Sequence, residues 1–282
     1  MKTQQSESIV RRGVKAISRY VPQVEKPKKK IQLSEKLIWS GIAVLLYLVM
    51  GQIPLYGVTD DPRFDFLAFA RVIFAAQQGT LLELGIGPIV TAGLLMQLLK
   101  GSDLLKLDFK NPDDRALFTS ATKIVTIVVI VVEGTLYGVS VYGNLVASPA
   151  FVPIVVVQLV AASFVVMMLD ELVQKGWGLG SGISLFIMAG VAQGIMWSVF
   201  SPIPADDGPV GVIPFTIDSA INGDIADAIF RVGQLPSLFG LFVTAIVLLV
   251  LVYIQGIHVD IPIVSTKYRG FTAVYPIKLL YT

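Results

Sequence analysis

The chain has 282 residues, of which 54% are hydrophobic and only 15% are charged. Soluble domains carry about 25% charged residues, so the composition excludes an ordinary soluble protein and indicates a membrane protein. There is no cysteine and one histidine, His258, which excludes disulfides, thiol catalysis and histidine-based metal sites. The formal charge of +2 is very unevenly distributed along the chain.

Residues 1–36 form a basic N-terminal region with ten lysines or arginines and three glutamates. Basic residues collect on the cytoplasmic side of membrane proteins, so we expect this end to be cytoplasmic. Within the region, residues 7–22 place aliphatic side chains on one helical face and basic ones opposite. That pattern is typical of a helix lying on an anionic membrane surface. The alternative is a solvated basic tail that only sets topology.

Six apolar runs between residues 37 and 257 are long enough to cross a hydrocarbon core of ~30 Å. They are continuous and not alternating, which favours helices over β-barrel strands. The expected spans are 37–56, 80–100, 117–141, 150–169, 183–200 and 236–257. We expect the acidic loop 201–235 to be external. Residues 258–282 are expected to be a cytoplasmic loop followed by the start of a seventh span at residue 276, as in part of a larger protein.

Between the first two expected spans, residues 63–79 (RFDFLAFARVIFAAQQG) are apolar enough to enter the membrane but too short to cross it. Asp65 and Arg71 interrupt the run. A re-entrant or interfacial helix fits this pattern, and at membrane depth it must be enclosed by protein. Two interpretations stay open: a structural loop helix, or a movable element that fills a cavity.

The second expected span contains unusually many glycine, proline and polar residues. Ile86 and Val90 are four residues apart and share one helical face, and Ile183 and Ile187 have the same spacing in the fifth span. Small residues beside them permit close helix approach. Pro88 removes one backbone hydrogen bond, so we expect a compensating neighbour or a bend there. The residues alone do not separate ordinary helix packing from a functional arrangement.

A few polar side chains lie within the expected spans, namely Thr91, Gln97, Glu133 and Gln158. Ionisable groups in a membrane are costly, which makes Glu133 a candidate functional residue. The alternative is an interhelical hydrogen bond that only holds the bundle together.

Other local patterns argue against catalysis. The sequence has no nucleophile elbow, zinc-protease motif or phosphate loop. Asp170 and Glu171 are adjacent, so on a helix they point in different directions and make a poor acid–base pair. Lys267 and Arg269 lie in the cytoplasmic loop, where cations can bind phosphate, anionic lipid or a protein, or act only as topology signals. We expect no enzyme, no metal and no cofactor.

Two glycine-rich segments carry a resemblance to a known family. GTLLELGIGPIVTAGLLMQLLKGS (79–102) and LDELVQKGWGLGSGISLFIMAGV (169–191) resemble the SecY family, the α-subunit of the Sec protein translocon. The loops at 111–123 and 260–278 also resemble this family. The sequence of these segments is more similar to the archaeal and eukaryotic branch of the family than to the bacterial branch. The resemblance implies an all-α membrane protein: a polytopic transmembrane helix bundle with a re-entrant plug helix, forming half of a larger channel.

The resemblance also implies residue roles. The hydrophobic pore ring would consist of Ile86, Val90, Ile183 and Ile187. The plug would occupy 63–78 and include Asp65, Phe66, Leu67, Phe69, Ala70 and Ile73. Thr91 and Glu133 match polar positions at the lateral gate, and Lys267 and Arg269 match a ribosome-binding loop. An aliphatic ring fits a polypeptide of any sequence and resists ions by dewetting.

The function implied by the resemblance is a protein-conducting channel subunit. It would translocate secretory polypeptides and release membrane-protein helices sideways into lipid, as a multi-pass protein of the cell membrane. Implied partners are SecE-type and small β-type subunits, the ribosome through rRNA phosphate, signal sequences, nascent polypeptides and membrane lipid. The alternative is a secondary transporter for a small solute, which also uses broken helices. A purely structural membrane scaffold is a third class.

Overall fold

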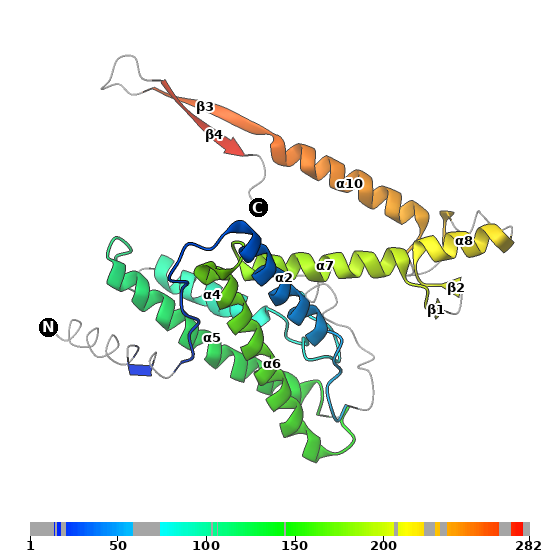
Figure 1. Ribbon diagram of the computed structural model, residues 1–282, viewed down its shortest axis with the longest axis horizontal. Helices are drawn as coiled ribbons and strands as arrows, with labels where there is room; N and C mark the ends of the chain where they lie inside the picture. The colour runs from blue at the N-terminus through cyan, green and yellow to red at the C-terminus, as the bar shows by residue number, and fades with distance from the viewer. Residues whose placement is uncertain are drawn as a thin grey trace. The chain divides into compact units, whose positions relative to one another are not determined.

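The structure is a computed structural model, shown in Figure 1. It describes residues 14, 16–17, 21–58, 74–102, 104–105, 107–143, 145–205, 208–222, 229–231, 236–264 and 272–278. The chain divides into two units, residues 1–192 and 193–282, and the boundary falls within helix α7.

The first unit is helical. Its long helices are α2 (Leu33–Met50), α4 (Gly87–Gly101), α5 (Pro112–Ser140), α6 (Val152–Leu172) and the first half of α7 (Gly182–Phe200). A short 3-10 helix, η1 (Pro149–Phe151), precedes α6, and a π-helical turn, η2 (Val173–Trp177), follows it. Helix α5 packs against both α4 and α6. Two α6 valines lie directly over Gly134 and Gly138 of α5, where the missing side chains permit this close contact.

The start of α5 follows from its local sequence. The Asn111 side chain accepts a hydrogen bond from the Asp113 backbone N–H at 3.0 Å, which caps the first turn. Pro112 occupies a first-turn position, where no backbone N–H is needed. Asp113 and Asp114 place negative charge at the positive end of the helix.

Among the described residues, five helical runs are long and apolar enough to cross a membrane: α2, α5, Pro149–Trp177, α7 and α10 (Leu238–Gly256). The expected span at 80–100 differs, because α4 begins only at Gly87 and residues 80–86 form turns. Gly79 and Gly85 adopt φ angles of 72° and 52°, which interrupt a right-handed helix. The 15 residues of α4 rise only ~22 Å, against a hydrocarbon core of ~30 Å.

In the described part of the second unit, the end of α7 is followed by two hairpins and two further helices. Strands β1 (Pro204–Ala205) and β2 (Gly208–Pro209) pair before helix α8 (Val212–Asn222). The Arg231 guanidinium lies 3.8 Å from the centre of the Phe215 ring, and its Nη1 donates to the Pro209 carbonyl at 2.8 Å. Arg231 therefore holds the β1–β2 hairpin and α8 together.

The segment after α10 is a hairpin and not an irregular loop. Strands β3 (His258–Val264) and β4 (Thr272–Lys278) are antiparallel, with His258 opposite Lys278 and Val264 opposite Thr272. Alternating β-branched residues in His258–Val264 favour a strand. Residues 276–278, which we expected to begin a seventh span, end β4, while 279–282 lie outside the described residues.

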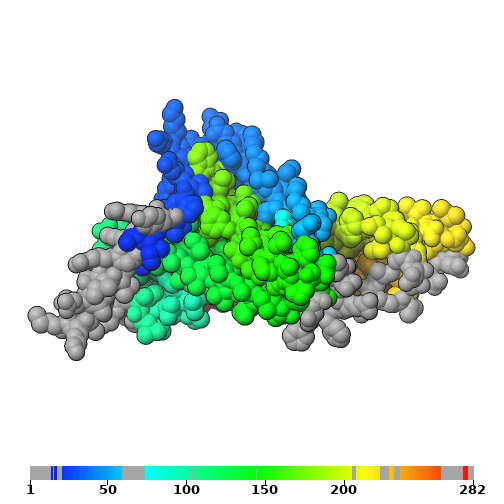
Figure 2. Space-filling model, turned by 90° about the horizontal axis from the view of Figure 1, so that it is seen from below, coloured from blue at the N-terminus to red at the C-terminus, as the bar shows by residue number. Residues whose placement is uncertain are grey.

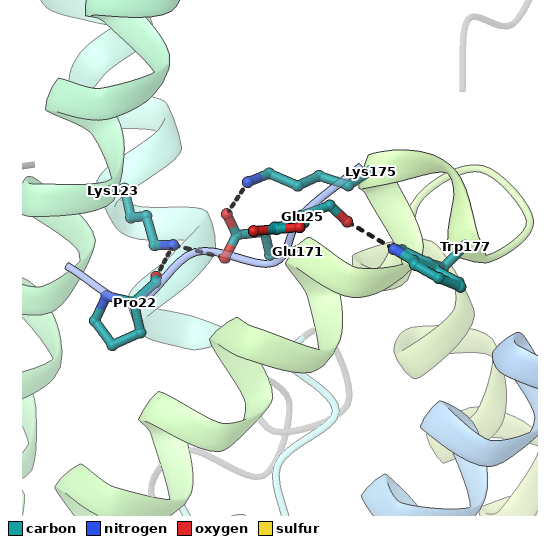
Figure 3. Close-up of polar contacts among 6 residues, drawn as sticks. All are labelled: Pro22, Glu25, Lys123, Glu171, Lys175 and Trp177. Carbon is teal, nitrogen blue, oxygen red and sulfur yellow. Dashed lines mark hydrogen bonds and ion pairs between the residues drawn. The ribbon is translucent and has the colours of Figure 1, made fainter. Parts of the chain in front are cut away.

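An N-terminal strap, residues 22–27, is bonded to α5 and to the η2 turn that follows α6. The Lys123 ammonium on α5 donates a hydrogen bond to the Pro22 carbonyl, and Trp177 Nε1 donates to the Glu25 carbonyl at 2.8 Å (Figure 3). In the space-filling view the same segment, in dark blue, lies against the surface of these helices (Figure 2). Most of the expected surface helix at 7–22 lies outside the described residues.

An ion-pair network fixes the lysine that binds the strap. Lys123 Nζ lies 2.6 Å from Glu171 Oε2, and Lys175 Nζ lies 2.7 Å from Glu171 Oε1. The Lys123 and Glu171 side chains are only 13% and 15% exposed, so solvent screens this pair less than a surface pair. Glu171 thus orients Lys123 toward the strap.

We predict that Lys123→Met loosens the strap, because it removes a charge-assisted hydrogen bond while Glu171 keeps Lys175. The chain has no native cysteine, so Val24→Cys gives a single labelling site in the strap. In detergent-solubilised protein, maleimide modification of this cysteine should accelerate about tenfold, as the loss of ~1.4 kcal/mol implies. Lys110→Met, at an exposed loop lysine, is the matched control. An equal rate in the Lys123 variant and its parent would contradict the prediction.

Candidate functional site

The four ring residues lie in one apolar cluster at the starts of α4 and α7. Ile86 is fully buried, and Val90, Ile183 and Ile187 are partly buried against the same core. Tyr47 of α2 and Phe186 of α7 are fully buried in the same core. The structure therefore brings together residues that are about a hundred positions apart in the sequence.

Backbone contacts fix the position of Ile86. Its N–H donates to the Phe74 carbonyl at 2.9 Å, and its own carbonyl accepts from Val90 N–H at 3.1 Å as α4 begins. A Cβ on Gly85 would lie 2.2 Å from the Phe74 oxygen, so only glycine permits this approach. Pro88 lies in the first turn of α4, where a backbone N–H has no partner within the helix, so the proline costs no helical hydrogen bond. Neither the compensating neighbour nor the bend considered for Pro88 is therefore needed.

Tyr47 connects α2 to α7 through the Phe74–Ala75 backbone. Its hydroxyl donates to the Ala75 carbonyl, and its ring stacks on Phe186 with centroids 4.6 Å apart. Ala75 in turn packs closely on Gly190 of α7. Tyr47 was not predicted as part of the site, although it carries the one side-chain hydroxyl in the aliphatic second half of α2, Gly41–Met50.

Thr91 and Glu133, the two residues predicted at the lateral gate, contact each other. The Thr91 side chain on α4 hydrogen-bonds the half-buried Glu133 carboxylate on α5. Glu133 Oε2 also lies 3.8 Å from where a Cβ on Gly87 would be, so the carboxylate sits over the first turn of α4. The bond joins two helices, and a role for Glu133 beyond holding α4 to α5 stays a prediction.

Other polar groups hold the turns beside the ring. Glu83 is buried, and its Oε2 accepts from the Gly79 N–H and the Tyr142 hydroxyl, each at 2.6 Å. Gln158 exchanges hydrogen bonds with both backbone groups of Tyr56, at 2.9 and 3.1 Å. These contacts tie the turns near 56 and 79 to α6 and to the residues after α5. The sequence analysis did not single out Glu83, whose position at a turn gave no spacing signal.

Two sets of predicted residues lie outside the described part of the chain. They are the plug residues within 59–73 and the loop residues Lys267 and Arg269. Only the segment that follows the first set, Phe74–Gln77, is described. Its backbone bonds to 82–86, because Gln77 N–H donates to the Leu82 carbonyl at 3.0 Å and Phe74 accepts from Ile86. Among the described residues, no group of three or more acidic or histidine side chains could hold a metal.

Comparison with known protein families matches most of the chain. The family model described as SecY matches residues 80–282, and the one described as the plug domain of Sec61p matches residues 45–79. The two matches meet at Gly79, the glycine of positive φ that precedes the turns before α4.

Curated relatives include archaeal and eukaryotic proteins. The protein translocase subunit SecY of Saccharolobus solfataricus is 40% identical over 276 residues, which cover 94% of this chain and 59% of that protein. The protein transport protein sec61 subunit alpha of Schizosaccharomyces pombe is 39% identical over 287 residues, covering 95% and 60%. The chain therefore spans about three-fifths of these relatives' length. Matches to archaea and yeast agree with the predicted branch.

Solved structures share the fold. One titled as the structure of a protein conducting channel has a TM-score of 0.73 and 37% identity, covering 93% of this chain and 56% of that chain. Sec61 in the canine ribosome-channel complex from the endoplasmic reticulum has a TM-score of 0.72 and 37% identity, covering 93% and 57%. They confirm the expected helical membrane fold. With the family match over residues 80–282, they lead to one conclusion: the chain belongs to the SecY family.

Proposed function

We propose that this protein is a subunit of a protein-conducting channel. It moves secretory polypeptides across a membrane and releases membrane-protein helices sideways into lipid. The observation that carries the proposal is the gathering of four aliphatic side chains at the starts of α4 and α7, around Tyr47 and Phe186. An aliphatic constriction offers no hydrogen bonds to compete for a passing chain, and it opposes ions by dewetting.

The family match supports the channel over the secondary transporter. The curated relatives are named for protein translocation and protein transport, and one similar structure is titled a protein conducting channel. A solute carrier would need a cluster of convergent polar groups near the middle of the membrane. Thr91 and Glu133 bind each other, which leaves them poorly placed as a substrate site. The proposed role is passive and non-enzymatic.

The movable parts of the channel are also proposals. Residues 63–78 would be the plug, and the match of 45–79 to a plug domain supports this. The Thr91–Glu133 bond would keep α4 and α5 together as one side of the lateral gate. Opening would then be a shift between closed and open populations, favoured by a signal sequence that binds the open state better.

The proposed partners follow from the same comparisons. One similar structure is Sec61 in a ribosome-channel complex, which supports ribosome binding here through the loop that holds Lys267 and Arg269. SecE-type and small β-type subunits, signal sequences, nascent chains and lipid complete the proposed set. The basic residues 1–36 support a cytoplasmic N-terminus, and we place the protein in the cell membrane as a multi-pass protein.

We predict that Ile86→Asn and Ile187→Asn each raise ion leak through the full-length protein reconstituted in vesicles. A polar side chain in the ring favours wetting, and a barrier lower by ~1.4 kcal/mol gives about tenfold more leak. Ile86→Leu, which keeps an aliphatic side chain of equal size, is the control. Leak that stays at the parental level in both asparagine variants would count against the ring and the channel proposal.

We also predict that the double change Lys267→Glu, Arg269→Glu weakens ribosome binding in a salt-dependent way. Removing two phosphate contacts should reduce the slope of log affinity against log salt by about 2. Lys28→Glu with Lys29→Glu changes the net charge equally in the N-terminal region and is the matched control. Parental affinity in the loop variant at low and moderate salt would refute the assignment.

A further inference from the structure

The turn between α6 and α7 is held by two buried polar side chains. Ser40 of α2 accepts a hydrogen bond from the Leu179 N–H at 2.8 Å, and Asp170 of α6 accepts one from the Ile183 N–H at 3.0 Å. Ser40 is 5% exposed and Asp170 is 6% exposed. Burying such groups is costly unless they are bonded, so both contacts restrict where the turn can lie.

Asp170 uses both carboxylate oxygens. Oδ1 receives the Ile183 N–H, and Oδ2 receives the Gln174 side-chain amide at 2.7 Å. The bond to Ile183 satisfies an N–H in the first turn of α7 that has no partner within the helix, and the negative charge lies at the helix's positive end. The carboxylate thus fixes the beginning of α7 to the end of α6.

Gly182, at the start of α7, leaves room for this carboxylate because it has no Cβ. A Cβ on Gly182 would lie 2.6 Å from Asp170 Oδ1 and 2.7 Å from the Asp170 Cα. Both distances are far below van der Waals contact, so any larger residue would separate the two helices here. The close approach and the hydrogen bond to Ile183 therefore depend on each other.

The two adjacent acids have different partners. Glu171 pairs with Lys123 and Lys175 and so belongs to the network that holds the N-terminal strap (Figure 3). Asp170 contacts α7. Because the two side chains point toward different partners, they make no acid–base pair. For the same reason, a change at Glu171 is a control for a change at Asp170.

We propose that Asp170 is a positioning residue for the pore ring. It binds the backbone of Ile183 itself and so sets where Ile183 and Ile187 lie relative to the α4 residues Ile86 and Val90. The expected effect of Asp170 on ion leak rests on the proposed function. The effect of Asp170 on the position of α7 can be measured whether or not the protein is a channel. Ile86 is positioned by backbone contacts, whereas Ile183 depends on this side chain.

The test measures the position of α7 directly in the full-length protein. Because the chain has no cysteine, Val157→Cys on α6 and Met188→Cys on α7 give two exposed spin-label sites, and pulsed electron resonance gives their distance. We expect D170A to broaden or shift the distance distribution by about 2 Å, the scale of helix shifts. D170N, which retains one acceptor oxygen, should largely restore it. E171Q should leave it unchanged.

A second variant reaches the same contact from the other helix. G182A keeps Asp170 but forces its carboxylate away from Ile183, so we expect the same change in distance. It reports on the contact even if D170A fails to assemble. Unchanged distances in G182A, and in D170A where it assembles, would overturn the proposal.

Ion leak in the same variants separates this proposal from the proposed function. We expect D170A and G182A to leak about tenfold more than the parent and D170N to stay near it. A changed distance with parental leak, in vesicles where Ile86→Asn does leak, would overturn the role of Asp170 in the ring. Absence of leak in Ile86→Asn itself would instead count against the proposed function.

Discussion

The backbone hydrogen bond from the Ile86 N–H to the Phe74 carbonyl is the contact on which the candidate ring most depends. This bond requires Gly85 in a left-handed conformation. The turns of 80–86 end at Ile86, and α4 begins at the next residue, Gly87. The same Phe74–Ala75 segment accepts the Tyr47 hydroxyl and packs on Gly190. One short stretch of backbone thus joins α2, α4 and α7 around the ring.

The two halves of the ring are held by different means. At α4 the backbone itself makes the contacts, so side-chain changes there alter the ring's chemistry more than its position. At α7 the buried Asp170 carboxylate holds the Ile183 N–H, and the glycine at 182 permits it. A helix start held by one side chain can be released by losing a few hydrogen bonds, which would suit the proposed constriction if it widens for a passing polypeptide.

The long helices could be predicted because ~20 apolar residues in a row have few alternatives in a membrane. The start of α4 could not, since hydropathy does not register the φ angles of Gly79 and Gly85. The segment after α10 was predicted only as a cytoplasmic loop, because the alternation of spans and basic residues assigns a side of the membrane and does not register strand pairing. Spacing placed Ile86 with Val90, but only the fold shows Thr91 bonded to Glu133 and Tyr47 to Ala75.

The central claim is that a polypeptide passes through the ring. Because the chain has no cysteine, a single cysteine at Ile86 can be tested for disulfide crosslinking to a cysteine in a stalled secretory chain, with Ser34→Cys, near the start of α2, as the control. The account predicts a crosslink at Ile86 and none at Ser34 in the full-length protein. No crosslink at Ile86 or at Ile183, or equal crosslinks at Ile86 and Ser34, would contradict it.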